Sequence, residues 1–471
     1  MDVHITLAGR GDHAARIYRQ LLDAILDGRL RPGERLPATR ELARQLEVSR
    51  NTVAVAYDRL GAEGYLTGRV GAGTYVCRLA GVGPAPHRRG APGGARPRRI
   101  WDSLPVAPVA PSVPPRYDFT VGVPDGALFP YETWRRLISQ SLRPTSIGSV
   151  DYARPEGHAG LREAIARHVG VSRAVHADPD DVLVTQGAQQ ALDVIGRVLI
   201  EPGAVVAVEE PGYPPARHLF RSLGARVVGV PVDAEGLVVD ELPRPARLVY
   251  VTPSHQFPMG TAMSLARRTA LLEWAQRHDA VVIEDDYDSE FRFSDRPLEP
   301  LQSIDRTGRV IYVGSFSKTL LPVLRLGFLV APPTLRPALR TAKQLTDWHS
   351  DTVTQATLAA FIDEGLLARH IRRATRLYAQ RHEAVVAWLA ADPRLTAVPS
   401  TAGLHVCARP AVDVDLDAVL ARATAAGVSV RSLASYCGDE PRPGLVIGYG
   451  AIPSTLIQPG LRLLGEALAQ R

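Results

Sequence analysis

The chain has 471 residues, of which 45% are hydrophobic and 22% are charged, so it exceeds one ordinary domain and is too apolar to be disordered. Its three cysteines lie far apart without metal-ligand spacing, which excludes a disulfide framework, indicates no metal centre and suits a reducing cytoplasm. The net charge is +6, and residues 1–116 carry 18 arginines against 10 acidic residues. With no signal peptide and no apolar run of about 18 residues, we expect neither secretion nor a membrane span.

The first eighty residues are predicted to form helices followed by a small hairpin. Isoleucines and leucines recur at helical spacing over residues 17–26, which predicts an amphipathic helix. Thr39 is predicted to cap a second, short helix and Ser49 a third. Residues 65–67 and 74–76 are predicted to form two strands around a glycine turn.

The two short helices and the tight turn between them suggest a helix-turn-helix, whose second helix enters the major groove of DNA. Val53, Tyr57 and Leu60 recur on the side that would pack against the first helix. The leading turn then presents side chains that suit phosphates and base edges, since Arg pairs with guanine and Asn with adenine. Arg40 would lie near the DNA backbone, and the Arg69 to Gly73 tip could reach the minor groove. A plain helical adaptor with solvated arginines is the alternative.

Four blocks of this segment are more specific than the spacing: Leu36-Pro-Ala-Thr-Arg-Glu-Leu-Ala, Val48-Ser-Arg-Asn-Thr-Val, Ala62-Glu-Gly-Tyr-Leu and Gly71-Ala-Gly-Thr-Tyr-Val. On these blocks the segment resembles the winged helix-turn-helix of GntR-type bacterial repressors. The resemblance implies a dimer that reads two half-sites of a double-stranded DNA operator. The operator contacts that it implies are Arg40, Ser49, Arg50, Asn51, Thr52 and Gly71, beside Arg69 of the wing.

Residues 79–116 have the composition of a linker, because they are rich in Pro, Gly, Ala and Arg and show almost no apolar periodicity. We therefore divide the chain into a DNA-binding domain at 1–78, this linker and a body at 117–471. The positive charge of the first two parts favours a polyanionic partner. A general arginine bias is the alternative, because the chain has only two lysines, Lys318 and Lys343.

The body alternates short apolar strands with helical patterns. Strands are predicted at 182–185, 205–209, 225–230, 248–252, 281–284, 310–314 and 327–331, with helices such as 189–199 and 265–278 between them. This order predicts an α/β fold with a mostly parallel sheet that is covered by helices on both faces.

Lys318 ends one of these strands in Gly314-Ser-Phe-Ser-Lys. A desolvated lysine can form a Schiff base with an aldehyde, and Ser315 and Ser317 beside it can bond a phosphate. Arg325 follows seven residues later and could neutralise the same phosphate. A surface loop is the alternative explanation of this motif.

Other strand ends carry groups that suit the same ligand. Backbone N–H groups at 187–189, where a helix is predicted to begin, form an anion seat. Asp285 could keep a pyridine nitrogen protonated while Tyr287 bonds the neighbouring ring oxygen, and Tyr213 could stack on the ring. Each has a simple structural explanation by itself, but together they favour a pocket for pyridoxal 5'-phosphate.

The body resembles fold-type I aminotransferases over nearly all of its roughly 355 residues, and its fusion to a GntR-like module resembles the MocR class of regulators. The resemblance implies Lys318 as the internal aldimine, Asp285 on the pyridine nitrogen and Tyr287 on the ring oxygen. It also implies that Tyr152 reaches the phosphate in the partner subunit, and hence a homodimer. The remaining implied cofactor contacts are Gly187, Ala188, Gln189, Ser315, Ser317 and Arg325 for the phosphate and Tyr213 for stacking.

Two departures from the enzymes' pattern argue against efficient transamination. The N-P-x-G turn, whose Asn bonds the ring oxygen, is replaced by Phe257-Pro-Met-Gly, which follows His255 and Gln256, so we expect either of those two side chains to substitute for the Asn. The arginine that clamps a substrate carboxylate has no obvious counterpart, and Arg431 and Arg442 are the candidates.

We therefore predict a transcriptional regulator whose aminotransferase-like domain senses pyridoxal phosphate, or an amino compound such as γ-aminobutyrate, through Lys318. A ligand that binds two domain arrangements unequally would change the affinity for DNA. Two alternatives stay open: a working aminotransferase with a DNA tether, and a cofactor-free interaction protein with a vestigial pocket.

Overall fold

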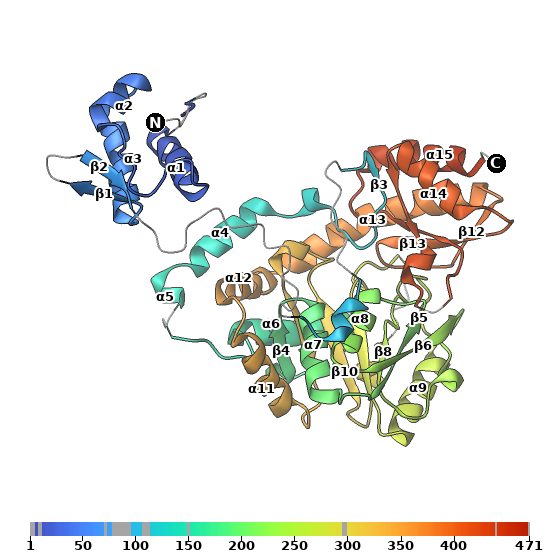
Figure 1. The fold of residues 1–471 in the computed structure, drawn as a ribbon. Helices are drawn as coiled ribbons and strands as arrows, with labels where there is room; N and C mark the ends of the chain where they lie inside the picture. Colours follow the sequence, from blue (N-terminus) through green and yellow to red (C-terminus); the bar gives the residue numbers. More distant parts are fainter. Residues whose placement is uncertain are drawn as a thin grey trace. The chain divides into compact units, whose positions relative to one another are not determined.

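The computed structural model describes residues 5–7, 12–69, 73–77, 96–105, 114–147, 151–293, 299–438 and 440–469. It divides into two compact units, Met1–Pro97 and Arg98–Arg471, which Figure 1 shows as ribbons. No helix within the described ranges is long and apolar enough to cross a membrane.

The first unit is a three-helix module with a hairpin. Its elements are α1 (His13–Leu26), α2 (Thr39–Gln45), α3 (Arg50–Ala62), β1 (Leu66–Arg69) and β2 (Gly73–Val76). The two strands pair antiparallel, with Leu66 opposite Val76. Ile17 and Leu21 of α1 are buried together with Val53 and Leu60 of α3, because apolar residues at spacings of three or four lie on one face of a helix.

The caps of the two short helices differ. Ser49 caps α3, as predicted, and its hydroxyl accepts a hydrogen bond of 3.1 Å from the backbone N–H of Thr52. The predicted cap at Thr39 is wrong, because Thr39 is already the first residue of α2 and Ala38 holds the N-cap position without a side-chain bond. The backbone of Ala38 is extended, with φ −60° and ψ 144°, so the chain enters the helix one residue earlier than the Thr side chain suggests.

The second unit is built on a mixed sheet of eight strands. In spatial order they are β4 (Val182–Thr185), β11 (Gly327–Val330), β10 (Val310–Ser315), β9 (Val281–Asp286), β8 (Ala246–Val251), β5 (Val205–Glu210), β6 (Arg226–Asp233) and β7 (Gly236–Leu237). The pairs from β10 through β6 are parallel, and β11 is antiparallel to both of its neighbours. The predicted α/β fold with a mostly parallel sheet is therefore confirmed.

Helices cover both faces of this sheet, as β8 illustrates. Leu248 and Tyr250 of β8 belong to the core cluster under α7 and α8, whereas Val249 and Val251 belong to the cluster under α9, because successive side chains of a strand point to opposite faces. The helices of this unit are α4 (Tyr131–Ser141), α5 (Pro144–Ile147), α6 (Ala159–Arg173), α7 (Ala188–Leu199), α8 (Pro214–Ser222), α9 (Leu265–Arg277), α10 (Leu301–Ile304), α11 (Arg336–Asp347), α12 (Thr352–Asp363), α13 (Leu366–Ala391), α14 (Leu416–Ala425) and α15 (Ser454–Ala469).

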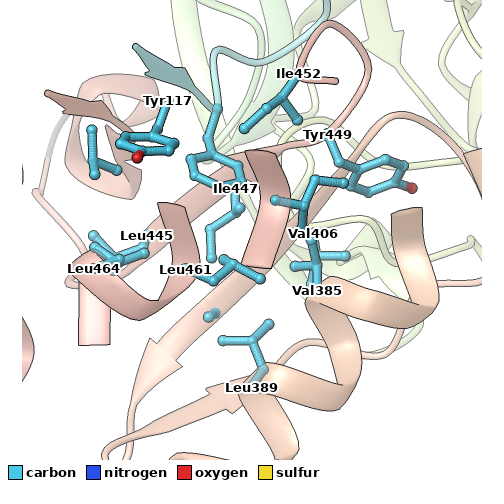
Figure 2. Packing of buried hydrophobic residues seen from close by; sticks show 14 of the residues in the cluster. Tyr117, Val385, Leu389, Val406, Leu445, Ile447, Tyr449, Ile452, Leu461 and Leu464 are labelled. Atoms are coloured by element: carbon cyan, nitrogen blue, oxygen red, sulfur yellow. The ribbon is translucent and has the colours of Figure 1, made fainter. Parts of the chain in front are cut away.

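A smaller antiparallel sheet forms the C-terminal part of the second unit. Its strands, in spatial order, are β12 (Leu395–Ala397), β13 (His405–Pro410), β16 (Leu445–Gly448) and β15 (Arg431–Ser432), and β14 (Val428–Ser429) pairs separately with β3 (Tyr117–Asp118). Figure 2 shows Val406 and Ile447 of this sheet gathered with Val385 of α13 and Leu461 of α15. Residues near 120 and near 400 contact segments that follow strands of the large sheet, because Gly122 accepts from Lys318 and Ser400 Oγ lies 3.1 Å from His255 Nε2.

The strand register brings the functional strand ends together. Asp285 of β9 pairs with Val313 of β10, and Ser315 at the end of β10 pairs with Gly327 of β11. Gly327 in turn pairs with Thr185 at the end of β4. A Cβ at Gly327 would lie 2.7 Å from the Cα of Gly187, so only glycine allows these strand ends to approach so closely.

Candidate functional site

A cavity of about 310 Å³ opens at this edge of the large sheet, which is where open α/β folds usually bind their ligands. Many of the predicted cofactor residues line it: Ala188, Gln189, Tyr213, Asp285, Tyr287, Ser315, Ser317, Lys318 and Arg325. Sequence reasoning did not identify Val121, Gly122, Tyr250, Thr252, Phe257 and Pro322, which complete the lining.

Lys318 is the nucleophile that the cavity offers. Its Nζ donates a hydrogen bond of 2.5 Å to the carbonyl oxygen of Gly122. Burial lowers the pKa of Lys318, although the charges of Asp288 and Asp285 oppose that shift. A lowered pKa makes the neutral, nucleophilic amine more accessible near neutral pH. Gly122 has φ +77°, and a Cβ there would lie 3.0 Å from Nζ, so the glycine leaves room for the amine.

Asp285 is a buried carboxyl group with one oxygen in use. The hydroxyl of Tyr250 donates a hydrogen bond of 2.8 Å to Asp285 Oδ2, while Oδ1 has no partner among the described residues. Burial raises the pKa of Asp285 to about 7, against the opposing effects of Tyr250 and Lys318. A protonated ring nitrogen in the cavity would satisfy the free oxygen and favour its ionised form.

The seat for an anion lies at the start of α7. Gly187 holds the N-cap position with φ +78° and no side-chain cap, so the first N–H groups of the helix stay available. Arg325 donates a hydrogen bond of 2.6 Å to the carbonyl oxygen of Gln186, which holds its guanidinium beside the seat. The backbone N–H of Ser317 donates to Ser315 Oγ at 3.2 Å. This set of donors suits a phosphate.

Two aromatic side chains stand on other walls of the cavity. The ring of Tyr213 meets that of Phe257 edge to face, with centroids 5.6 Å apart, and burial raises the pKa of Tyr213 to about 12, so its hydroxyl keeps its proton. The hydroxyl of Tyr287 lies 2.9 Å from His255 Nδ1. Neither His255 nor Gln256 lines the cavity, and His255 contacts its wall through Tyr287.

Tyr152 and the candidate arginines lie outside this cavity. Tyr152 is 74% exposed, and its ring centroid lies 5.2 Å from that of Trp348. Arg431 lines a neighbouring cavity of about 320 Å³ that shares Tyr213 and Phe257 with the first. Arg442 lines neither of these two cavities.

In the first unit, the predicted DNA-contacting side chains gather at the starts of α2 and α3. Arg40, Arg50 and Asn51 are exposed, and within the described ranges their side chains form no intramolecular hydrogen bond or ion pair. Ser49 and Thr52 are engaged in the cap, since their hydroxyl oxygens lie 2.8 Å apart. The Arg69 guanidinium lies 5.0 Å from the ring centroid of Tyr75. Gly71 lies outside the described residues.

Two family descriptions match the chain. Residues 13–76 match the gntR family of bacterial regulatory proteins, and residues 118–435 match aminotransferase class I and II. Each match falls within one of the two units.

Among curated proteins the chain is similar to regulators over almost its whole length. It is 38% identical to the probable rhizopine catabolism regulatory protein MocR of Rhizobium meliloti, with 96% of this chain and 93% of that protein covered. It is 33% identical to the pyridoxine biosynthesis transcriptional regulator PdxR of Corynebacterium glutamicum, with coverages of 96% and 95%. Among solved structures it resembles the α-aminoadipate aminotransferase LysN of Thermus thermophilus, with 29% identity, a TM-score of 0.69 and coverages of 79% and 93%.

Proposed function

Because the chain belongs to the MocR-type regulators, in which a gntR-family domain precedes an aminotransferase class I and II domain, we propose that it is a transcriptional regulator that senses pyridoxal phosphate, or an amine bound to that cofactor, at Lys318. The observation that carries the proposal is the Lys318 amine, whose pKa is lowered by burial, in a cavity that also holds an anion seat and the carboxyl of Asp285. A regulator of this kind acts where the chromosome is, in the cytoplasm.

The residues at the sheet edge fit the cofactor. When bound, pyridoxal phosphate supplies an aldehyde that condenses with an amine and releases water. The start of α7, Arg325 and the two serines would hold the phosphate, and the free Asp285 Oδ1 would accept from the ring nitrogen. Tyr287 would donate to the ring oxygen, and Tyr213 would stack on the ring. Lys318 Nζ, which now bonds Gly122, would supply the amine.

The effector is either the cofactor or an amine that exchanges with Lys318. The name of PdxR, a regulator of pyridoxine biosynthesis, supports the first choice. The position of Arg431 beside Tyr213 and Phe257 supports an amine that also carries an anionic group, such as an amino acid. Tyr152, which is 74% exposed beside the 51% exposed Trp348, supports a homodimer in which this face is covered.

DNA recognition falls to the start of α3. Arg50 and Asn51 are exposed on the leading turn, and Ser49 just before them caps the helix by accepting from the N–H of Thr52. Bidentate contacts from Arg and Asn to base edges would give specificity. Occupancy of the cavity would then alter operator affinity, provided that the ligand binds the DNA-competent arrangement and the other arrangement unequally.

The first test is chemical. The full chain is saturated with pyridoxal phosphate, reduced with borohydride and digested, and the peptides are weighed. We expect the cofactor mass on the peptide of Lys318 and none on that of Lys343. Lys343 is an internal control because it is fully buried and bonded to Asp347. An unmodified Lys318 would refute the proposal.

The second test links the cofactor to DNA. Gel shifts with the DNA upstream of the gene are run with and without pyridoxal phosphate, for the wild-type chain and for Lys318→Ala. We expect the cofactor to change the wild-type affinity only. Equal affinities under both conditions would leave a DNA-binding protein that does not sense the cofactor, and steady transamination at ordinary enzyme rates would favour a tethered enzyme.

A further inference from the structure

Behind Tyr287 lies a buried histidine–carboxylate pair that the proposed function does not use. His255 Nδ1 lies 3.0 and 3.1 Å from the two carboxylate oxygens of Asp288 and 2.9 Å from the hydroxyl oxygen of Tyr287. His255 Nε2 lies 3.1 Å from Ser400 Oγ. His255 is 2% exposed and Asp288 is 1% exposed, so water hardly competes for these contacts.

Two glycines leave the space that the pair occupies. A Cβ at Gly403, where φ is +83°, would lie 2.1 Å from His255 Cε1 and 2.5 Å from Asp288 Oδ2. A Cβ at Gly260 would lie 3.3 Å from His255 Nε2. Gly260 closes the turn in which the chain departs from N-P-x-G. The departure therefore places a histidine behind the cavity wall, where the backbone confines it from two sides.

The chemistry of the pair determines which atom carries a hydrogen. Carboxylate oxygens accept hydrogen bonds, and both oxygens of Asp288 lie within 3.1 Å of His255 Nδ1, so this nitrogen carries a hydrogen. An Nδ1–H group cannot accept a hydrogen bond from Tyr287, so its single hydrogen is shared between Asp288 and the hydroxyl oxygen of Tyr287. The hydroxyl hydrogen of Tyr287 then remains free, and Tyr287 lines the cavity.

We propose that Asp288 and His255 are positioning residues that turn the hydroxyl hydrogen of Tyr287 toward the ring oxygen of bound pyridoxal phosphate. The inference rests on the proposed function, because it needs the cofactor at Lys318. The enzymes' Asn bonds that oxygen directly, whereas His255 acts through Tyr287. Removal of the pair would let the Tyr287 hydroxyl rotate away from the ring oxygen.

Several titratable groups of the described residues act on the pair through charge: Asp285, Glu290, Lys318, His382, His405 and Tyr449. His405 of β13 has its ring centroid 4.8 Å from that of His255, and its pKa is held well below the usual range by burial and by the charge of His255. Its Nε2 lies 3.1 Å from the carbonyl oxygen of Pro258. His382 of α13 also has a lowered pKa, chiefly through burial. Lys318 interacts with Asp288 through charge. The direct contacts of 3.0 and 3.1 Å make His255 the partner of Asp288.

The test follows the absorption band of the bound cofactor as a function of pH. A hydrogen bond to the ring oxygen draws electron density from that oxygen. It therefore disfavours protonation of the Lys318 nitrogen that is bonded to the cofactor. His255→Leu removes the positioning of that bond, so we expect the midpoint of the band's titration to rise by roughly one pH unit. His255→Asn returns an N–H donor close to the place of Nδ1, and its midpoint should lie near that of the wild type.

A double-mutant cycle separates positioning from a structural role. In Tyr287→Phe the hydroxyl is absent, so adding His255→Leu should not move the midpoint further. Asp288→Asn should raise the midpoint in the same direction, because an amide can donate to Nδ1 and thereby free that nitrogen to accept from Tyr287. Asp288→Asn therefore tests the positioning role by itself if His255→Leu does not fold. His278→Leu, in which the lost imidazole lies at the end of α9 and stacks on Trp274, should behave as the wild type.

The outcomes distinguish the two proposals. An unmodified Lys318 in the wild type refutes the proposed function. A modified Lys318 together with an unchanged midpoint in His255→Leu overturns the positioning role alone, and so does a shift that adds fully to that of Tyr287→Phe.

Discussion

The two regions that bind phosphate in the proposed function are built in opposite ways. On α2 and α3 the DNA-facing side chains Arg40, Arg50 and Asn51 are exposed and, in the part of the chain that the structure describes, have no intramolecular partner. At the sheet edge, Arg325 is already bonded to a carbonyl oxygen, and the other donors are backbone N–H groups at the start of α7 and the hydroxyls of Ser315 and Ser317. In the proposed function, DNA with its many phosphates is bound by side chains that stay solvated until binding. The small cofactor instead needs groups that the fold holds in place before it binds.

Two substitutions on α3 together test the DNA-binding region. Arg50→Ala with Asn51→Ala should weaken specific operator binding about a hundredfold, since each good base contact contributes roughly a factor of ten or more. Arg59→Ala on the same helix, whose guanidinium already pairs with Glu63, is the matched control. Fluorescence anisotropy with operator DNA measures both. Equal losses in the two variants would mean that α3 contributes only charge.

Arg325→Ala tests the anion seat of the cavity. Loss of a charge-assisted contact to the phosphate should raise the dissociation constant of pyridoxal phosphate by roughly tenfold or more, which spectrophotometric titration measures. Lys318 should still be modified at saturation, because the amine is untouched. Arg309→Ala, whose ion pair with Asp279 lies on the surface, should bind the cofactor normally. A normal affinity in Arg325→Ala would remove Arg325 from the anion seat.

The stabilities of the two units should also depend differently on pH, because only the second unit buries carboxyl groups among the described residues. Burial raises the pKa of Asp285 and of Glu284 to about 7 and that of Glu290 to about 8. These three carboxyl groups therefore bind more protons in the folded, cofactor-free protein than in the unfolded chain between these values and the ordinary carboxyl range, and their contribution to the free energy of unfolding falls as pH rises through that window.

Asp285→Asn tests this pH effect. It should raise the melting temperature of the cofactor-free second unit above pH 7, where the wild-type carboxyl ionises, and should have little effect near pH 4. Calorimetry at the two pH values measures the difference. A lower melting temperature for the variant above pH 7 would contradict the expectation that the buried, ionised Asp285 carboxylate destabilises the cofactor-free protein.

The smallest effect concerns the caps of the first unit. Ser49→Ala should lower the free energy of unfolding of that unit by about 1 kcal/mol, because the N–H of Thr52 loses its side-chain acceptor. Thr39→Ala is the matched control, since Thr39 makes no cap, and should cost less. Thermal unfolding followed by circular dichroism compares them. Equal losses of unfolding free energy in the two variants would mean that the Ser49 cap does not stabilise the first turn of α3.

Several parts of the site follow from short stretches of sequence. The strand predicted at 182–185 matches β4, and Ser49 caps α3 as predicted, because apolar runs and caps depend on neighbours only a few residues away. Asp285 and Lys318 could be predicted because they lie at or just beyond the ends of such strands: Asp285 is the last residue but one of β9, and Lys318 comes three residues after β10. Tyr250 was missed because it lies inside an apolar strand, although a buried hydroxyl always needs a partner.

What the sequence by itself determined is therefore local: which stretches are helix or strand, which polar groups stand at their ends, and which blocks identify the family. Only the tertiary structure decided which of these groups meet. Gly122 offers its carbonyl to an amine 196 residues away, and His255 came to lie behind Tyr287 rather than in the cavity. Such contacts depend on strand register and on the packing of two sheets, which arise from the burial of whole faces and leave no periodic trace in any one segment.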